Sequence, residues 1–187
     1  MPASSQRALK TGYLRQLFLQ CTSQSFHLKK ILLRKAMHTI TVRQAVLSDI
    51  KALALLFDSY RQFYGGASDV PAAKAFLLAR FDHGESALFI AFDGTTPAGF
   101  TQLYPSFSSL SMARIFVLND LFVESQARRK GVASLLMSAA VAYASTLGAI
   151  RVSLSTAVTN ASAQALYEGA GWKRDAQYFV YEFAVAG

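Results

Sequence analysis

Cysteine is almost missing from this 187-residue sequence, in which the only one is Cys21. From Met37 onward there is therefore no disulfide, no cysteine nucleophile and no thiolate metal site, and a reducing, cytoplasmic location is expected. The three histidines show no ligand spacing, so we expect no metal site. No apolar run approaches the roughly 18 residues of a membrane span, so no membrane association is expected.

Acidic residues are missing from the first 36 residues, which hold seven of the 19 Lys and Arg side chains. The remainder has 12 basic and 11 acidic residues, so most of the net charge of +8 belongs to the first segment. Because a nucleic-acid-binding domain usually carries its charge on the folded body, we expect no nucleic-acid partner. Residues 1–36 are interpreted as a basic, non-catalytic extension.

Three explanations of this extension stay open: a targeting segment, a basic interaction arm, or upstream sequence outside the working protein. Its loose helical spacing of apolar residues suits a transit peptide or an amphipathic helix lying on a surface. Met37, just before the first strand-like run, would serve as an alternative start and favours the third explanation. The segment lacks the continuous apolar core of a secretory signal.

Residues 37–187 predict one α/β domain, because their length suits a single core and the chain is 52% apolar and 16% charged. Alternating and helical apolar spacings predict the element order strand, two helices, three strands, helix, strand, helix, strand. Ser48 and Asp49 offer an N-cap to the first helix, Asp69 is expected to begin the second, and Asp93–Gly94 predicts a hairpin. The expected strands cover residues 39–45, 86–94, 96–106, 113–123, 149–157 and 178–185, with no repeat and no linker among them.

The stretch "ARRKGVASLL" places three cations, Arg128, Arg129 and Lys130, directly before Gly131, between a strand and a helix. A helix N-terminus attracts anions, and a glycine lets the backbone approach a phosphate closely. Cations at that end are unfavourable unless an anion joins them. The alternative is a solvated basic turn, and neither G-x-x-x-x-G-K-[ST] nor G-x-G-x-x-G is present.

Two stretches resemble the GNAT superfamily of N-acetyltransferases. "LNDLFVESQARRKGVASLLMSAAVAYA" is similar to its central motif, a strand, then [Q/R]-x-x-G-x-[G/A], then a helix, matched at Arg128, Gly131 and Ala133. "NASAQALYEGAGWKRD" resembles the second motif, matched at Asn160, Ala163, Leu166, Tyr167, Gly171 and Trp172. The stretch "FTQLYPSFSSLSMARIFVLNDLFV" further resembles a branch that includes small histone and polyamine acetyltransferases. The resemblance covers nearly all of residues 37–187.

The resemblance implies a single mixed, mostly antiparallel sheet of six to seven strands, with splayed central strands and about four flanking helices. It also implies acetyl-CoA as co-substrate. The expected contacts of its pyrophosphate are Arg128, Arg129, Lys130, Gly131, Val132, Ala133 and Ser134. Its pantetheine arm is expected to pair with the backbone of Leu121, Phe122 and Val123, and Asn160 and Tyr167 complete the implied set. The last strand could form a homodimer, or it could lie wholly inside the domain.

The resemblance implies that Tyr167 protonates the departing CoA thiolate, which suits a phenol that stays protonated at neutral pH. Asn119 and Asp120 interrupt an apolar run, where the family has a bulge that splays two strands. If the strand is continuous, Asp120 is a candidate base or amine anchor. Plainer alternatives are a turn at Asn119–Asp120, core packing of Tyr167, and a helix-capping role for Asn160.

The implied activity is direct acetyl transfer from acetyl-CoA to a primary amine, which is a small molecule, a polyamine or a lysine side chain. No covalent enzyme intermediate is needed, which agrees with a domain without cysteine. The residues expected to line the acceptor groove are Phe57, Tyr60, Phe63, Tyr64, Gly65, Tyr104 and Phe107. Two other functions are considered: an inactive CoA-binding sensor, and a nucleic-acid-binding protein that uses the basic arm.

Overall fold

The computed structural model describes residues 39–185 of the chain. The basic extension of residues 1–36, with Cys21, and the alternative start at Met37 lie outside the described residues. Among the helices of residues 39–185, none is both long and apolar enough to cross a membrane.

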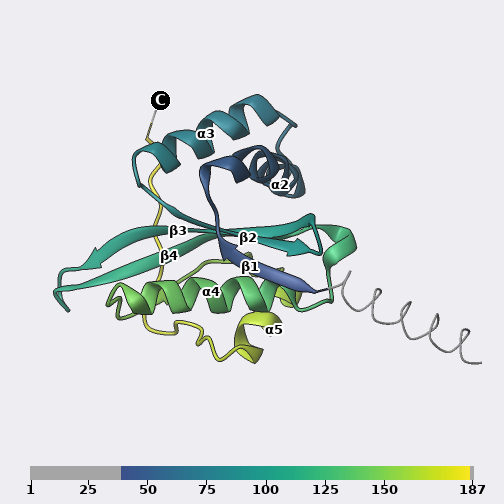
Figure 1. Cartoon of the computed structure of the whole chain (residues 1–187). Helices are drawn as coiled ribbons and strands as arrows, with labels where there is room; N and C mark the ends of the chain where they lie inside the picture. The colour runs from purple at the N-terminus through teal and green to yellow at the C-terminus, as the bar shows by residue number, and fades with distance from the viewer. Residues whose placement is uncertain (1–38, 186–187) are drawn as a thin grey trace, which may run out of the picture.

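The described residues form one mixed, mostly antiparallel sheet in the order β1-β2-β3-β4-β5 (Figure 1). The strands are β1 (Ile40–Gln44), β2 (Ala87–Asp93), β3 (Thr96–Ser108), β4 (Ala113–Val123) and β5 (Val152–Ser153). The first four strands pair antiparallel with their neighbours, and β4 pairs parallel with β5. Gly94 has a φ of 62° in the short turn between β2 and β3, which confirms the hairpin expected at Asp93–Gly94.

Helices cover both faces of the sheet, as Figure 1 shows. Helices α2 (Ile50–Phe63) and α3 (Val70–Asp82) lie on one face, and α4 (Val132–Thr146) and α5 (Ala161–Gly169) lie on the other. Two short 3-10 helices, η1 (Leu47–Asp49) and η2 (Ser125–Ala127), precede α2 and α4. The mixed α/β class with about four helices is therefore confirmed.

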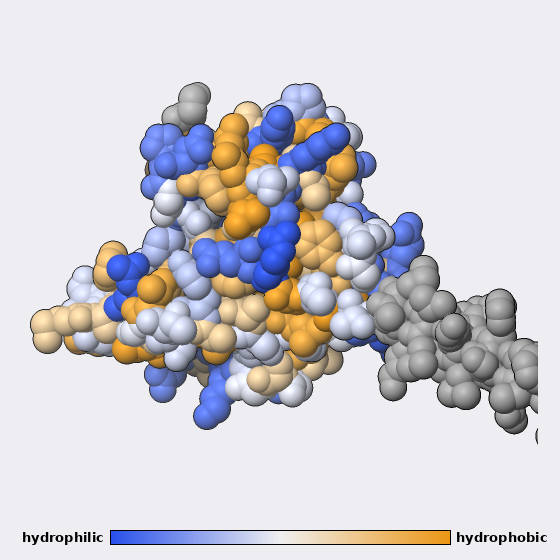
Figure 2. Space-filling model, viewed as in Figure 1, coloured by the Kyte–Doolittle hydropathy of each residue, from blue (hydrophilic) through white to orange (hydrophobic). Residues whose placement is uncertain are grey.

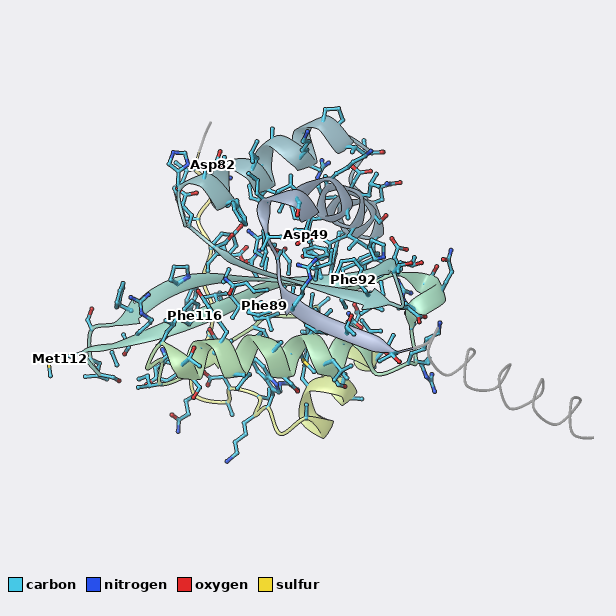
Figure 3. All side chains as sticks on the ribbon, viewed as in Figure 1. Asp49, Asp82, Phe89, Phe92, Met112 and Phe116 are labelled. Carbon is cyan, nitrogen blue, oxygen red and sulfur yellow. The ribbon has the colours of Figure 1, made fainter. Side chains whose placement is uncertain are left out.

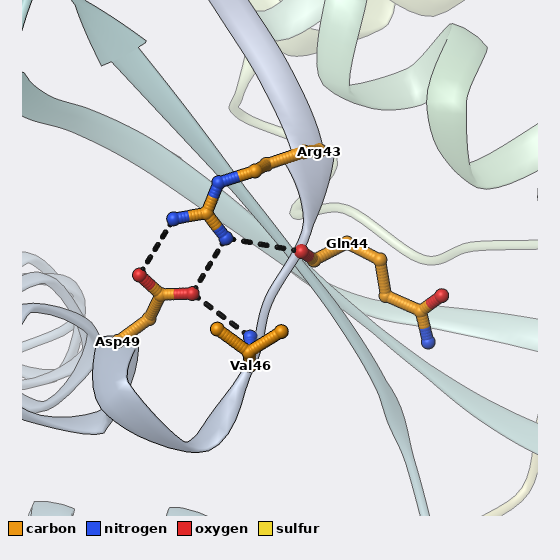
Figure 4. Close-up of polar contacts among 4 residues, drawn as sticks. All are labelled: Arg43, Gln44, Val46 and Asp49. Carbon is orange, nitrogen blue, oxygen red and sulfur yellow. Dashed lines mark hydrogen bonds and ion pairs between the residues drawn. The ribbon is translucent and has the colours of Figure 1, made fainter.

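The two acidic residues expected to begin α2 and α3 behave differently. Asp69 caps α3, since its side chain accepts a hydrogen bond of 2.9 Å from the Ala72 amide. Asp49 occupies the capping position of α2 without a capping bond from its side chain. Its carboxylate instead accepts two hydrogen bonds from Arg43, of 2.6 and 2.8 Å, and one of 2.8 Å from the Val46 amide (Figure 4). This contact ties β1 to the start of α2.

Two hydrophobic cores flank the sheet because β-strand side chains alternate between its faces. Towards α4, the core includes Phe89 and Phe116, labelled in Figure 3, with Leu136 of the helix. Towards α2 and α3, the core includes Phe100 and Phe122. Hydrophobic patches lie among the hydrophilic ones on the surface around α2 and α3 (Figure 2).

The sheet has five strands in the described residues, so the expectation of six to seven strands is wrong there. The strand expected at 178–185 does not form, and β5 covers only two of the residues expected at 149–157. The large hydrophobic side chains of residues 178–185 are 77–92% exposed. An alternating apolar pattern fits a strand only when a neighbouring strand accepts its backbone hydrogen bonds, and no strand of residues 39–185 does so.

The hairpin between β3 and β4 extends past the rest of the sheet, at the left of Figures 1 and 2. Near its tip, Phe107, Leu110 and Met112 are 67%, 95% and 93% exposed. The guanidinium of Arg114 lies 5.0 Å from the centre of the Phe107 ring. Phe107, expected in the acceptor groove, therefore belongs to this hairpin and not to the cavity described below.

Candidate functional site

A bulge in β4 sets the geometry of the candidate site. Gln102 of β3 pairs with Asp120, whereas the next residue, Leu103, pairs with Leu118, which leaves Asn119 as the extra residue. The strand is continuous from Ala113 to Val123, so the alternative of a turn at Asn119–Asp120 is wrong. Asn119 is exposed, while Asp120 is only 4% exposed. The bulge thus turns a carboxylate into the protein interior.

Strands β4 and β5 separate just before this bulge. Their ladder consists of two pairs, Phe116 with Val152 and Val117 with Ser153. A cavity of about 50 Å³ opens directly beyond the last pair of this ladder. Its lining residues are Tyr60, Tyr64, Leu118, Asn119, Leu121, Leu154, Ser155, Thr156 and Tyr167. The expected splay of the central strands is therefore present, with a cavity between them.

Sequence reasoning missed Leu154, Ser155 and Thr156, which follow β5 and form one wall of this cavity. They stand at the carboxyl end of a strand that runs parallel to its neighbour. Ligands of open α/β sheets bind at that end, so this rule could have identified them.

The loop before α4 presents backbone amides at the other end of the site. Helix α4 begins at Val132 after Gly131, and the first bond of its ladder runs from the Leu135 amide to the Gly131 carbonyl, at 3.1 Å. The amides of Val132, Ala133 and Ser134 precede that bond, and no side chain caps them. These N–H groups and the helix dipole favour an anion.

Two residues of this loop have left-handed backbone conformations. Gly131 has a φ of 79° and Arg129 a φ of 64°, a region that a residue with a side chain rarely adopts. A Cβ atom at Gly131 would meet nothing within 4 Å. The glycine is therefore required by its φ, and the space beside it is open to a ligand.

The basic side chains of the loop contact the protein. Arg128 donates to the Val123 carbonyl at 3.0 Å and lies 5.7 Å from the centre of the Phe63 ring. Lys130 forms an ion pair of 2.8 Å with Asp93, which ties the loop to the turn between β2 and β3. The structure thus brings the backbone of 128–134 together at a helix start but directs these two side chains to protein partners.

A pantetheine arm is expected to pair with the end of β4. One edge of this end pairs with β3, and the other edge continues past the last pair of the β4–β5 ladder. Leu121 lines the cavity, Phe122 belongs to the core below α2 and α3, and Val123 pairs with Gly99. Within residues 39–185, no strand pairs with the outer edge of Leu121–Val123, so this edge is open to an added strand, although the Val123 carbonyl already accepts a hydrogen bond from the Arg128 side chain.

Asp120 is a buried carboxylate without an ion pair in the described part of the chain. Burial raises its pKa above the ordinary range, and hydrogen bonds from Asn119 and Tyr60 partly oppose that rise. The Asn119 amide donates to it at 3.2 Å. Burial, together with the charge of Asp120 and the hydrogen bond to it, raises the pKa of Tyr60. The phenol therefore stays protonated and can donate.

A polar network beside Asp120 was missed by sequence reasoning. Gln102, with no exposed surface, donates to the Ser86 hydroxyl at 2.9 Å and to the Tyr104 hydroxyl at 2.8 Å. Its side-chain oxygen has no partner among the described residues. Burial, and then the charge of Asp120, raises the pKa of Tyr104. A glutamine inside the apolar run "GFTQLY" was the available signal.

The residues of the second motif lie on α5. Tyr167 lines the cavity and packs against Trp172, with ring centres 6.3 Å apart. Burial, with Tyr64 as a smaller cause, raises the pKa of Tyr167, so its hydroxyl remains a proton donor. The side chain of Asn160 accepts from the Ala163 amide at 3.1 Å, which confirms its interpretation as a helix cap.

Of the residues expected to line an acceptor groove, Tyr60 and Tyr64 line this cavity, whereas Phe57, Phe63, Gly65, Tyr104 and Phe107 do not. The ring centres of Tyr60 and Tyr64 lie 5.1 Å apart. Phe57 is buried and stacks on Phe76 at 5.5 Å, so it belongs to the core. Residues 39–185 contain no group of three or more His, Cys, Asp or Glu side chains that could hold a metal ion.

Comparisons with known proteins agree with this arrangement. The family model described as "Acetyltransferase (GNAT) family" matches residues 53–172. An uncharacterized N-acetyltransferase of Bacillus subtilis (strain 168), YhfO, is 48% identical over 142 residues, which cover 76% of this chain and 95% of that protein. A probable acetyltransferase of Haemophilus influenzae is 40% identical over 93 residues, which cover 49% of this chain and 64% of that protein. The crystal structure of a probable acetyltransferase aligns with a TM-score of 0.74 and 38% identity, covering 79% of this chain and 99% of that one.

Proposed function

Since the chain belongs to the GNAT family of acetyltransferases, we propose that it transfers the acetyl group of acetyl-CoA directly to a primary amine. One observation carries the proposal. The separation of β4 from β5 opens a cavity that is lined by Tyr60, Tyr167 and the outer edge of β4, and the carboxylate of Asp120 is buried beside Tyr60.

The proposed binding of acetyl-CoA uses backbone groups. Its pyrophosphate would accept from the amides of residues 128–134, where α4 begins without a side-chain cap and the space beside Gly131 is open. Its pantetheine amides would pair with Leu121–Val123, as an added strand does at a sheet edge. Asn160 would support the bound molecule by holding the start of α5, which carries Tyr167.

The proposed chemistry is one nucleophilic addition and one elimination. A neutral amine attacks the thioester carbonyl carbon, and backbone donors near Phe122 and Val123 polarise its oxygen. Asp120 accepts the proton that the ammonium must lose, which its raised pKa favours. Tyr167 gives its proton to the departing sulfur and regains one from the new amide nitrogen.

The acceptor is proposed to be a small-molecule amine, a polyamine or a lysine side chain. We further propose that the chain is related to the small histone and polyamine acetyltransferases, that it acts in the cytoplasm and that it forms a homodimer. The proposed activity requires neither a nucleic acid nor a membrane as a partner. An inactive CoA-binding sensor is the second candidate, and the buried carboxylate of Asp120 together with the protonated hydroxyls of Tyr60 and Tyr167 at the cavity favours the enzyme.

Calorimetric titration of acetyl-CoA into the full chain tests the proposed binding site. Gly131→Glu places a carboxylate at the phosphate position and is expected to weaken binding by at least about 100-fold. Gly148→Glu is the matched control, because Gly148 also has a positive φ of 69° and open space beside it, at the other end of α4. Equal binding by the two variants would contradict the site.

Thiol release with a panel of amines then separates the two functions. An enzyme releases CoA thiol with at least one amine of the panel, which includes alkylamines, polyamines, an aminoglycoside and a lysine peptide. Tight binding of acetyl-CoA without thiol release from any of them would favour the sensor.

A further inference from the structure

Asp120, the proposed base, does not itself line the cavity in which the amine would react. The lining includes its neighbours Asn119 and Leu121 but not Asp120, which is 4% exposed on the side of the sheet that faces α2 and α3. A base must come within hydrogen-bond reach of the proton that it removes, directly or through one intermediary. An intermediary is therefore required here.

Tyr60 of α2 lies between the cavity and Asp120. It lines the cavity together with Tyr167. Its ring packs on Phe100 and Phe122, which lie on the same face of the sheet as the paired residues Gln102 and Asp120, so its hydroxyl lies beside the Asp120 carboxylate and influences the pKa of that group. A phenol can give one proton and receive another at the same oxygen, so it can connect an acid on one side with a base on the other.

The Tyr60 ring is held firmly for this task. Its centre lies 6.0 Å from that of Phe57, 5.9 Å from Phe100, 6.2 Å from Phe122 and 5.1 Å from Tyr64. Three of these four rings belong to the core below α2 and α3. Aromatic packing on this scale fixes the ring and hence the position of its hydroxyl.

The side chains around Asp120 leave its carboxylate able to accept a proton. Gln102, directly across the ladder, directs both of its N–H donors to Ser86 and Tyr104 and none to the carboxylate. The groups that face Asp120 are then Tyr60 from α2, Tyr104 from β3 and Asn119 from β4, and none of these is a cation. A carboxylate without a cationic partner can take up a proton without breaking an ion pair.

We propose that Tyr60 is a catalytic residue that carries the proton of the acceptor ammonium from the cavity to Asp120. This inference rests on the proposed acetyl transfer. The ammonium N–H donates its proton to the Tyr60 oxygen while the Tyr60 O–H proton passes to the Asp120 carboxylate. The products are a neutral amine, an unchanged tyrosine and a protonated Asp120, which later releases its proton to water.

The proton balance agrees with the overall reaction. An ammonium ion loses two protons when it becomes a secondary amide. One goes through Tyr60 to Asp120, and the other goes through Tyr167 to the sulfur as the carbon–sulfur bond breaks. Tyr60 and Tyr167 therefore have separate tasks in the same cavity.

A double-mutant cycle on the full chain tests the relay. Tyr60→Phe and Asp120→Asn are each expected to lower kcat by on the order of 100-fold with the affinity for acetyl-CoA unchanged. The double variant is expected to be no slower than Asp120→Asn, because residues that act as a unit are not additive. Tyr143→Phe, on the opposite face of the sheet against Phe89 and Phe116, is the control and keeps the wild-type kcat.

A second readout does not depend on turnover. The Tyr60 hydroxyl opposes the rise in the pKa of Asp120, so Tyr60→Phe should raise that pKa further, and Tyr143→Phe should not. Carbon-detected NMR of the Asp120 carboxyl against pH measures this change.

The possible outcomes are distinguishable. If Tyr60→Phe keeps kcat within twofold while Asp120→Asn does not, or if the two losses multiply, the relay is refuted and the acetyl transfer stands. An unchanged Asp120 titration in Tyr60→Phe also refutes it. If the wild-type chain releases thiol with no amine of the panel, the proposed function is overturned and the relay with it.

Discussion

Gly99 of β3 makes the closest backbone contact with the part of β4 where acetyl-CoA is proposed to bind. A Cβ atom at this position would lie 2.5 Å from the Phe122 carbonyl oxygen, 3.2 Å from the Val123 Cα and 3.3 Å from its Cγ2. Gly99→Ala would therefore force the end of β4 to move by about 0.5 Å or more, because Cβ contacts under 3.0 Å are essentially never found. The first two of these neighbours are backbone atoms, which cannot rotate away.

The expected magnitude follows from two opposing effects. Forcing an extra methyl group into a well-packed site costs about 1–3 kcal/mol. The loss of glycine freedom in the unfolded chain returns about 0.4–1 kcal/mol. Because the closest atom is a backbone oxygen that cannot rotate away, the upper half of the first range applies, and the net destabilisation is about 1–2.6 kcal/mol. This lowers the Tm of a chain of this size by roughly 2–10 °C. Because Phe122 and Val123 move, the affinity for acetyl-CoA should fall as well.

Thermal unfolding and acetyl-CoA calorimetry measure both effects. Gly169→Ala is the control, because Gly169 ends α5 and a Cβ there would meet nothing within 4 Å. That variant should be as stable as the wild type or more so. A Gly99→Ala protein with an unchanged or higher Tm would refute the reasoning, since the contact with Phe122 would then have no cost.

Three further predictions concern single contacts. Asn160→Ala removes the cap of α5 and should cost about 1 kcal/mol in denaturant unfolding, whereas Asn160→Asp should keep the cap; equal losses would contradict the capping role. The Arg43 guanidinium holds the pKa of Asp49 below its usual range, so the pair stabilises the fold above about pH 4 and less as the pH falls through the lowered pKa. Arg43→Met should therefore lose about 1 kcal/mol at neutral pH and less near pH 2, and a pH-independent difference would argue against the ion pair. Tyr167→Phe should lower kcat by at least about 10-fold. Because the pKa of Tyr167 is raised, the wild-type rate should not fall through its ionisation below about pH 10.

Local signals in the sequence were sufficient for the elements that depend on neighbouring residues. The cap at Asp69, the turn at Gly94 and the helix start after Gly131 each need only a few adjacent positions. The motif residues Tyr167 and Asn160 fall on the short helix expected for them. These positions depend on short-range chemistry that a single sequence displays.

Features that depend on pairing between distant segments were not accessible in the same way. The pairing of Gln102 with Asp120 and the contact of Tyr60 with Asp120 require a register that only the folded sheet defines. For the same reason, the apolar alternation of 178–185 suggested a strand that the described structure lacks, since alternation says nothing about a partner.

The two separate cores give the two halves of the proposed reaction independent mechanical support. The amides of the α4 start belong to the helix packed on one face, while Tyr60 and Tyr64 belong to the layer packed on the other. Substitutions in α2 and α3 can reshape the wall that meets the amine without repacking the helix that meets the nucleotide. Such a division lets acceptor preference diverge among descendants of one ancestor while the shared acetyl donor stays the same.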